Sequence, residues 1–337
     1  MARYFITGGT GFIGQHLVKR LLSEGHRVAC LSRRPIRHVP AGKNLIWIEA
    51  DLLEPEKYSD CLRSCDHVVH LAGIINSRRK EVYQQVNVDG TDALLRICRK
   101  VNSSRMRFLY ISSIAALGPS GDNSLLKETD TPRPDSEYGR SKLRAEEIVR
   151  EYSRNIPAVI LRPSFIYGPG DSRGLQFLEL FSSQTDLISY SIIKTVCVCH
   201  VSDLVDACLL TVSRNCRAGD VFHISDPKAY TWEDLSDILI TIFRELFPLS
   251  SRQDSAHPGL RPKVGLDEGE MAAGGACKYW GCDISKARAE LLFAPRYTLT
   301  SGARETISWY RDNKQDINFQ PFGEFSGKGV GDHGNAQ

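Results

Sequence analysis

The sequence predicts an α/β protein, a doubly wound parallel sheet followed by a smaller, mostly helical C-terminal domain. Strand-forming runs alternate with helical patterns through the first half of the chain, as in a parallel sheet. Two predicted strands, at 68–72 and 108–112, are nearly continuous apolar runs, as expected for strands covered on both faces. A glycine-rich turn follows the first strand directly and leads into a helix, which is typical of this class.

The elements of the sheet follow one another in a regular order. The predicted strands are Arg3 to Thr7, Arg27 to Ser32, Leu45 to Glu49, His67 to Ala72, Arg107 to Ser112 and Ala158 to Arg162. The predicted helices between them are His16 to Leu22, Pro55 to Leu62, Val82 to Val101 and Tyr138 to Tyr152. Ligands on such sheets bind beyond the carboxyl ends of the strands, so functional residues are expected there.

The alternation weakens after Ser164. The segment up to Thr195 has the pattern of loop and helix, and the later elements are strands at 196–201 and 221–224 and amphipathic helices at 231–247 and 283–292. We expect a first domain of residues 1–163 plus about 196–225, and a substrate-binding domain of 164–195 and 226–320. Residues 248–275 are poor in large apolar side chains and are expected to form a mobile loop, and the Gly-rich tail 323–337 to be disordered.

Composition indicates an ordinary globular enzyme. Of the 337 residues 42% are hydrophobic and 25% charged, and the formal net charge of +3 is too small and too dispersed to indicate nucleic acid binding. No run of about 18 uncharged apolar residues exists, so no membrane span is predicted. The first predicted strand begins at Arg3, which leaves no room for a signal peptide, and we expect a cytoplasmic protein.

The ten cysteines are therefore expected to be reduced thiols. The run Cys197-Val-Cys199-His200 contains potential metal ligands, but it alternates like a strand and the chain has no C-x-x-C pair. Buried thiols are the preferred interpretation, and no metal site is predicted.

The turn at residues 8–14 predicts a nucleotide site of the Rossmann type. Gly9, Gly11 and Gly14 match G-x-G-x-x-G, and Gly8, Gly11 and Gly14 match G-x-x-G-x-x-G. A turn without side chains lets a pyrophosphate approach backbone N–H groups at the positive end of the following helix. A lone match would be weak, but its place between the first strand and a helix makes it specific.

The end of the second strand favours NADP(H). NAD-preferring sites carry a carboxylate about 20 residues beyond the glycines, which binds the ribose 2'-hydroxyl. Ser32 stands there, followed by Arg33 and Arg34, and an arginine can hold the 2'-phosphate of NADP by charge-assisted hydrogen bonds. NAD(H) remains the alternative cofactor. The competing interpretation is that Arg33, Arg34, Arg37 and His38 form a solvated basic loop.

Tyr138 and Lys142 form a candidate proton-transfer pair. Their spacing of four places both on one face of the predicted helix. An ammonium beside a tyrosine favours the phenolate and lowers a tyrosine pKa that is ordinarily about 10. Such a pair also arises by chance on solvated helix faces, so its meaning depends on the neighbouring motifs.

Further motifs accompany the glycine turn and the tyrosine–lysine pair along the chain. In order, the motifs are Thr7-Gly-Gly-Thr-Gly11-Phe-Ile-Gly14, Asp51-Leu52, His70-Leu-Ala-Gly73, Asn87-Val-Asp-Gly-Thr91, Ser112-Ser113, Tyr138-x-x-x-Lys142, Leu161-Arg-Pro163, Tyr167-Gly-Pro-Gly-Asp171 and His200-Val-Ser-Asp203. Taken together, they resemble the extended short-chain dehydrogenase/reductase superfamily, the NAD-dependent epimerase/dehydratase family. The resemblance covers about residue 2 to about 312.

The resemblance implies a role for each matching residue. Tyr138 would be the general acid or base, Lys142 would lower its pKa and hold the nicotinamide ribose, and Ser113 would bind the same substrate oxygen. Asn87 would have a structural role between the central strands. The implied cofactor contacts are Gly8, Gly11, Phe12, Ile13 and Gly14 at the pyrophosphate, Asp51 and Leu52 at the adenine, Leu71, Ala72 and Gly73 along the cofactor, and Pro163 and Ser164 near the carboxamide.

Three departures from the nucleotide-sugar enzymes of this family bear on the substrate. Leu117, Phe165 and Val196 stand where those enzymes commonly carry a tyrosine, an asparagine and an arginine. The pattern Ser-Ser-x-Ala-Ala-x-Gly at 112–118 looks more like the dihydroflavonol-reductase and 3β-hydroxysteroid-dehydrogenase branches. We therefore expect these residues to line a site for an apolar ketone or alcohol, although each is also compatible with simple core packing.

The functional expectation is an NADP-preferring oxidoreductase that transfers a hydride between nicotinamide and a carbonyl or secondary alcohol of a fairly apolar small molecule. Two alternatives remain open: a nucleotide-sugar epimerase or dehydratase, and a non-catalytic nucleotide-binding redox sensor. The sequence leaves the oligomeric state open; a homodimer is one option, since the resemblance implies that the helices at 82–101 and 138–152 are the ones that pair in dimers of similar enzymes.

Overall fold

A parallel sheet is the centre of the fold. The computed structural model describes residues 1–36, 42–101, 106–171, 193–214, 216–247 and 278–313. Within them, seven parallel strands lie in the order β3-β2-β1-β4-β5-β6-β9. The strands are β1 (Arg3–Thr7), β2 (Arg27–Ser32), β3 (Leu45–Glu49), β4 (His67–His70), β5 (Arg107–Ile111), β6 (Ala158–Pro163) and β9 (Val221–Ile224). This order reverses between β1 and β4, which creates a crevice at the strand ends.

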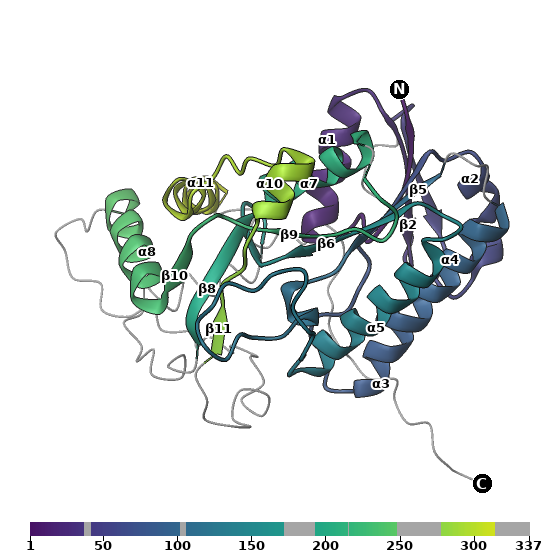
Figure 1. Cartoon of the computed structure of the whole chain (residues 1–337). Coiled ribbons are helices and arrows are strands. Elements are labelled where there is room, and N and C mark those ends of the chain that lie inside the picture. Colours follow the sequence, from purple (N-terminus) through teal and green to yellow (C-terminus); the bar gives the residue numbers. More distant parts are fainter. Residues whose placement is uncertain (37–41, 102–105, 172–192, 215, 248–277, 314–337) are drawn as a thin grey trace, which may run out of the picture.

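Helices cover both faces of this sheet (Figure 1), as the predicted doubly wound fold requires. One face carries α1 (Phe12–Ser23), α7 (Val201–Ser213) and α10 (Ser285–Leu291). The other carries α2 (Ser59–Arg63), α4 (Gly90–Val101) and α5 (Glu137–Tyr152).

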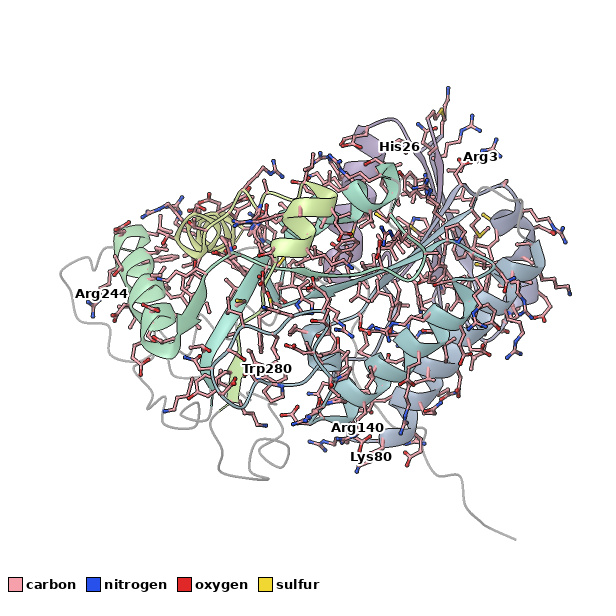
Figure 2. All side chains as sticks on the ribbon, in the orientation of Figure 1. Arg3, His26, Lys80, Arg140, Arg244 and Trp280 are labelled. Carbon is pink, nitrogen blue, oxygen red and sulfur yellow. The ribbon has the colours of Figure 1, made fainter. Side chains whose placement is uncertain are left out.

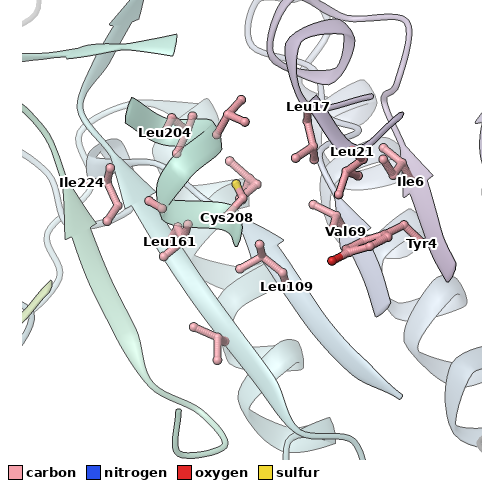
Figure 3. Packing of buried hydrophobic residues seen from close by; sticks show 14 of the residues in the cluster. Tyr4, Ile6, Leu17, Leu21, Val69, Leu109, Leu161, Leu204, Cys208 and Ile224 are labelled. Atoms are coloured by element: carbon pink, nitrogen blue, oxygen red, sulfur yellow. The ribbon is translucent and has the colours of Figure 1, made fainter. Parts of the chain in front are cut away.

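Each face has its own hydrophobic core. Figure 3 shows the first, where Leu17 and Leu21 of α1 and Leu204 and Cys208 of α7 pack over the apolar side chains of the sheet. Leu21 and Leu204 are fully buried, and each such side chain contributes roughly 1.5–3 kcal/mol to folding. The carboxyl ends of the strands thus project from a rigid layered scaffold.

Two predicted helices have a different internal structure. The helix expected at 55–62 is divided into a 3₁₀ turn, η1 (Pro55–Lys57), and α2, because Tyr58 leaves the helical conformation (φ −125°) and donates its hydroxyl to Leu52 O. The helix expected at 82–101 begins earlier, as α3 (Lys80–Tyr83), and passes through a π-helical segment, η2 (Gln84–Asp89), before α4. Such segments are frequent at functional sites.

A smaller sheet lies beside the first (Figure 1). Its central strand β8 (Ile193–His200) pairs with β10 (Ala229–Thr231) antiparallel and with β7 (Phe165–Tyr167) and β11 (Lys278–Trp280) parallel. Two helices pack on it, α8 (Trp232–Leu246) and α11 (Leu299–Asp312). Thr231 and Thr298 begin these helices with capping boxes.

The prediction of loop and helix directly after Ser164 was wrong for β7. This strand has only three residues, too few to show a period of two. Cys197 and Cys199 are buried on β8, which confirms the strand and the buried thiols expected there. The segments predicted to be a mobile loop (248–275) and a disordered tail (323–337) lie outside the described residues.

The predicted domain boundaries remain a prediction. Of the range 196–225, which was assigned to the first domain, β9 joins the large sheet and α7 packs on it, whereas β8 is the centre of the small sheet. In the parts of the chain that the structure covers, none of the helices is long and apolar enough to cross a membrane.

Candidate functional site

The glycine turn joins β1 to the uncapped N-terminus of α1. Gly8 adopts φ +73°, and a Cβ there would lie 2.7 Å from the Ala72 nitrogen. A Cβ on Gly14 would collide with Gly8 O, so helix and turn approach closely only because both residues are glycine. Gly11 is the N-cap residue of α1, no side chain caps the helix, and its first turn contains no acidic residue. The N–H groups at this end, which no side chain caps, fit a pyrophosphate.

The residues predicted at the adenosine end follow β2 and β3. Ser32 is buried, its hydroxyl donates to Arg34 O (2.8 Å), and Arg33 is exposed beyond it. Asp51 is half-buried and its carboxylate accepts from Leu53 N (3.0 Å), while Leu52 is buried. Ser32, Arg33 and Asp51 thus lie at carboxyl ends of neighbouring strands. Arg37 and His38 of the predicted basic loop lie outside the described residues.

A directed hydrogen-bond chain holds the segment after β4. Thr91 Oγ1 donates to Asn87 O (2.6 Å) and therefore accepts from His70 Nε2 (2.9 Å). His70 Nδ1 then accepts from Thr7 Oγ1 (2.6 Å), which accepts from Ala72 N (3.2 Å). Burial lowers the pKa of His70 to about 3, so the ring stays neutral and keeps this tautomer. The chain ties the expected cofactor wall, Leu71 to Gly73, to the glycine turn.

Asn87 fixes the same segment from the other side. Its side-chain oxygen accepts from Ile74 N (2.7 Å), and its amide donates to Ile74 O (3.0 Å) and to Ser141 Oγ (2.9 Å). Asn87 therefore links the end of β4 to α5, in keeping with the structural role expected for it.

Tyr138 and Ser113 come from two segments held in close contact. Ser113 precedes a 3₁₀ turn, η3 (Ile114–Ala116), and its Oγ accepts from Ala115 N (3.1 Å). Tyr138 lies in the first turn of α5, and a Cβ on the next residue, Gly139, would collide with Ala115 O. Both side chains are half-buried. This bond uses a lone pair of Ser113 Oγ and leaves the hydroxyl's own hydrogen uncommitted to Ala115.

The start of α5 is further fixed by charge. Glu137 pairs with Lys80 (3.2 Å) and with Arg140 (2.9 Å), and Figure 2 shows these two basic side chains together at this end of the molecule. Exposed pairs of this kind contribute about 0–1 kcal/mol each.

Lys142 is buried beneath the site. Its Nζ donates to Ile111 O at the end of β5 (2.7 Å) and lies 4.4 Å from the centre of the Tyr110 ring. A Cβ on Gly73 would lie 3.8 Å from this Nζ, so the ends of β4 and β5 meet α5 here. Burial lowers the pKa of Lys142 to about 7, and the carboxylate of Glu146 opposes this lowering.

The end of β6 supplies the residues expected near the nicotinamide. Pro163 and Ser164 are buried, and Ser164 Oγ is one of the buried polar atoms without a hydrogen-bond partner among the described residues. A buried hydroxyl without a partner costs about 1–3 kcal/mol, which a carboxamide bound there would offset. Together with the uncapped N-terminus of α1, this hydroxyl makes the site fit a nicotinamide dinucleotide.

The three residues expected to line the substrate site differ in exposure. Leu117 and Val196 are buried in the hydrophobic cluster of the small sheet, with Ile114 and Trp280 among their neighbours. Simple core packing, the alternative stated for them, describes both. Phe165 is 50% exposed at the start of β7.

The sequence-based reasoning missed a buried ion pair below Lys142. Glu146 and Arg162 are 0% and 1% exposed and form a bidentate pair. Two signals were present in the sequence. Glu146 continues the four-residue spacing of Tyr138 and Lys142, and Arg162 interrupts an otherwise apolar strand.

Comparison with known proteins finds a matching family model and several similar proteins. The model of the NAD dependent epimerase/dehydratase family matches residues 4–225. Ceramide reductase from Caulobacter vibrioides is 29% identical over 334 residues, covering 91% of this chain and 93% of that protein. Sterol-4-alpha-carboxylate 3-dehydrogenase, decarboxylating, from Candida albicans is 24% identical over 353 residues, covering 91% and 97%.

A solved structure gives the same picture of the fold. MoeE5 in complex with UDP-glucose and NAD superposes with a TM-score of 0.72 and 28% identity, covering 93% of this chain and 99% of that chain. The chain therefore belongs to the NAD dependent epimerase/dehydratase family, a family of NAD(P)-dependent enzymes.

Proposed function

We propose that this chain is an NADP-preferring oxidoreductase that acts on a carbonyl or secondary alcohol of a fairly apolar small molecule, with Tyr138 as the general acid or base. The observation that supports the proposal is the packing of α5, which bears Tyr138 and Lys142, against the end of β5 and the turn that begins at Ser113, in a fold whose first glycine turn fits a dinucleotide.

The side chains have complementary tasks in this proposal. A dihydronicotinamide, when bound, supplies a hydride to the carbonyl carbon. The carbonyl oxygen then gains negative charge, and the Tyr138 and Ser113 hydroxyls stabilise it by donating hydrogen bonds. Tyr138 passes its proton to that oxygen, and the Lys142 ammonium favours the phenolate left behind. Oxidation of an alcohol runs through the same groups in reverse.

The preference for NADP is supported by the end of β2. The exposed Arg33 follows a buried serine, and no carboxylate stands there to bind a ribose 2'-hydroxyl. An apolar substrate is supported by Phe165, a large exposed aromatic side chain at the junction of the two sheets. Ceramide reductase and the sterol dehydrogenase, whose names refer to a lipid and a sterol, are similar over nine-tenths of the chain.

The second candidate is a nucleotide-sugar epimerase or dehydratase, which the similarity to MoeE5 in complex with UDP-glucose favours. The two candidates differ in cofactor balance. An oxidoreductase consumes added NADPH in proportion to ketone, whereas an epimerase or dehydratase turns over sugar nucleotide without net change in added cofactor. A panel of lipid and sterol ketones and UDP-sugars separates them by NADPH absorbance and product analysis.

The variant Tyr138→Phe tests the mechanism. It removes the acid or base and one donor to the substrate oxygen, so kcat is expected to fall by about 10²-fold or more, while NADPH binds with unchanged affinity. Turnover equal to that of the parent protein contradicts the role of Tyr138. NADPH binding by the parent protein without turnover of any substrate favours the redox-sensor alternative.

A further inference from the structure

A buried carboxylate continues the row of side chains formed by Tyr138 and Lys142. Glu146 lies one helical turn beyond Lys142 on the same face of α5 and is completely buried. The carboxylate faces the sheet, directly below the proposed proton-transfer site. Nothing in the proposed reaction requires it.

Every hydrogen bond of this carboxylate connects it to a structural element of the site. Oε1 accepts from Ser112 Oγ (2.6 Å) and from Arg162 Nε (2.8 Å). Oε2 accepts from Arg162 Nη2 (2.7 Å) and from Arg150 Nη2 (3.0 Å). Bidentate pairing of this kind fixes orientation as well as charge.

The partners of Glu146 are the direct neighbours of candidate site residues. Ser112 directly follows the last residue of β5 and precedes Ser113, and Arg162 precedes Pro163 at the end of β6. One carboxylate therefore fastens the ends of two strands to the helix that carries Tyr138. Breaking such a buried pair on one side costs about 3–5 kcal/mol, because the remaining charge is left without a partner.

The same groups determine the electrostatic field at Lys142. Glu146 and Tyr138 lie near Lys142 on the same helix, and the Tyr110 ring of β5 lies under the lysine ammonium. His70 of β4 is neutral, and the charge of Lys142 helps to lower its pKa. In this surrounding, Glu146 is the carboxylate that favours the protonated lysine.

Glu146 is in turn surrounded by positive groups. Arg150 of α5 and Arg162 of β6 bond to it, and His223 of β9 lies near both Arg162 and Glu146. Burial lowers the pKa of His223 to about 4, so its ring is neutral at the pH of interest. Two guanidinium groups therefore pair with the one carboxylate that favours the protonated form of Lys142.

We propose that Glu146 and Arg162 are positioning residues of this site: their buried pair holds the strand ends that carry Ser113 and Ser164, and it sets the charge of Lys142. The proposal rests on the proposed function for its meaning in catalysis, but its electrostatic part concerns Lys142 alone.

The proposal predicts shifts of opposite sign for the two partners. The variant Glu146→Gln removes the negative charge and leaves Arg162 unneutralised, so Lys142 and Tyr138 both lose protons at lower pH. The variant Arg162→Gln leaves the carboxylate unneutralised, so both lose protons at higher pH. Each pKa is expected to move by about one pH unit, the lower end of the range for a change in a nearby charge. The double variant Glu146→Gln/Arg162→Gln is neutral and returns toward the parent value.

A partly exposed partner provides a test that does not endanger folding. Arg150 contacts the same carboxylate at the edge of the network. The variant Arg150→Gln is expected to raise the pKa of Lys142 by a few tenths of a pH unit, because solvent screens its charge. The matched control is Arg144→Gln on the same helix, whose side chain binds Gln84 and which should leave the pKa unchanged.

The measurement is the ¹³Cε chemical shift of Lys142 as a function of pH, in protein without cofactor, with the signal assigned by its absence in Lys142→Arg. The pH dependence of kcat/KM is recorded beside it, because this profile reports groups of the free enzyme. Opposite shifts of the lysine signal in the two single variants support the proposal. If these variants do not fold, a rise with Arg150→Gln and none with Arg144→Gln supports it.

Shifts of the same sign in both single variants, or no shift in folded Arg150→Gln protein, overturn the proposal, since a purely structural network would lower activity without moving the titration. The proposed role of Tyr138 and the control of Lys142 by the ion pair are contradicted by different results. A lysine signal that shifts while the kcat/KM profile stays in place contradicts the proposed role of Tyr138, not the control of Lys142 by the ion pair.

Discussion

The two sheets of this molecule differ in the length and orientation of their strands and in the helices that cover them. The large sheet consists of parallel strands of four to six residues, with helices on both faces and a continuous core on each. The small sheet has one long strand, β8, and three neighbours of three residues each, in mixed orientation. A long, doubly covered sheet positions backbone groups accurately, whereas short strands allow the side chains around them to vary.

This difference suggests a division of tasks. The groups proposed to hold the cofactor and move the proton lie at the ends of β1 to β6 of the large sheet and on α5, which packs on it. The chain then crosses to the small sheet within one residue, Ser164, between Pro163 and Phe165. We therefore expect changes in the large sheet to affect cofactor and chemistry, and changes beyond Ser164 to affect substrate choice.

The largest effect is expected for Gly14→Ala. The added methyl group collides with Gly8 O, so the turn must open and its N–H groups move away from the pyrophosphate. We expect NADPH affinity to fall about 100-fold or more, the equivalent of two lost hydrogen bonds to a charged group at about 1.5–3 kcal/mol each. Fluorescence titration of NADPH measures it. In the control Gly42→Ala, the added methyl group meets no atom of the described residues within 4 Å, and this variant should bind normally. Normal affinity in Gly14→Ala would remove the turn from the cofactor site.

The same contrast appears in what the sequence predicts. The ends of β1, β2, β3 and β9 agree with the predicted strands, because each is an apolar run between clear breaks. The three-residue strands of the small sheet carry no such pattern, and β7 was missed. The helix break at Tyr58 also depends on a tertiary contact, the hydrogen bond to Leu52 O, that local sequence does not show.

Some residues of the candidate site could likewise be predicted from the sequence, and others could not. The pair Tyr138 and Lys142 and the glycine turn are local spacings, which the sequence displays directly. The partnership of Glu146 with Arg162 joins a helix to a strand, and only the packing of α5 on β6 brings the two together. The exposure of Phe165, and the burial of Leu117 and Val196, likewise depend on how the small sheet packs. Substrate residues are therefore harder to predict than cofactor residues.

A smaller effect, confined to the large sheet, is expected for Arg33→Ala. If Arg33 binds the 2'-phosphate, its loss removes a charge-assisted hydrogen bond of about 1.5–3 kcal/mol. The dissociation constant for NADPH should then rise about 10- to 100-fold while that for NADH changes little, as measured by parallel titrations. Arg27→Ala, at the opposite end of the same strand, is the matched control. Equal losses for both cofactors would rule out the 2'-phosphate contact.

Beyond Ser164 the expected effect moves from cofactor to substrate. The variant Phe165→Asn introduces the amide common in the nucleotide-sugar enzymes and removes an apolar surface. Because burial of one such side chain contributes about 1.5–3 kcal/mol, kcat/KM for an apolar ketone should fall about tenfold or more, with NADPH affinity unchanged. Leu292→Asn is the control, since Leu292 is exposed and has a positive φ that asparagine tolerates well. A loss of NADPH affinity in Phe165→Asn would break the proposed division between the sheets.

The last effect concerns the dependence of stability on acid, to which residues of both sheets contribute. Burial lowers the pKa of His70 to about 3 and that of His200 and His223 to about 4, so all three are neutral in the folded protein at neutral pH. Unfolded histidine binds a proton below about pH 6.5, so the stability from these groups is lost as pH falls from 6.5 toward 4. Each contributes a slope of at most about 1.4 kcal/mol per pH unit.

His70 and His223 belong to the large sheet, whereas His200 ends β8 in the small one. The variant His200→Asn removes one titrating ring and keeps the cap of α7, since asparagine also accepts from Ser202 N. The stability of this variant at pH 8 falls because the stacking on Tyr297 is lost. Its stability should, however, depend less steeply on pH between 6.5 and 4, because one histidine fewer takes up a proton on unfolding. Urea unfolding at several pH values measures both quantities. An unchanged slope would mean that His200 takes up its proton in the folded protein, and that the large sheet alone determines acid sensitivity.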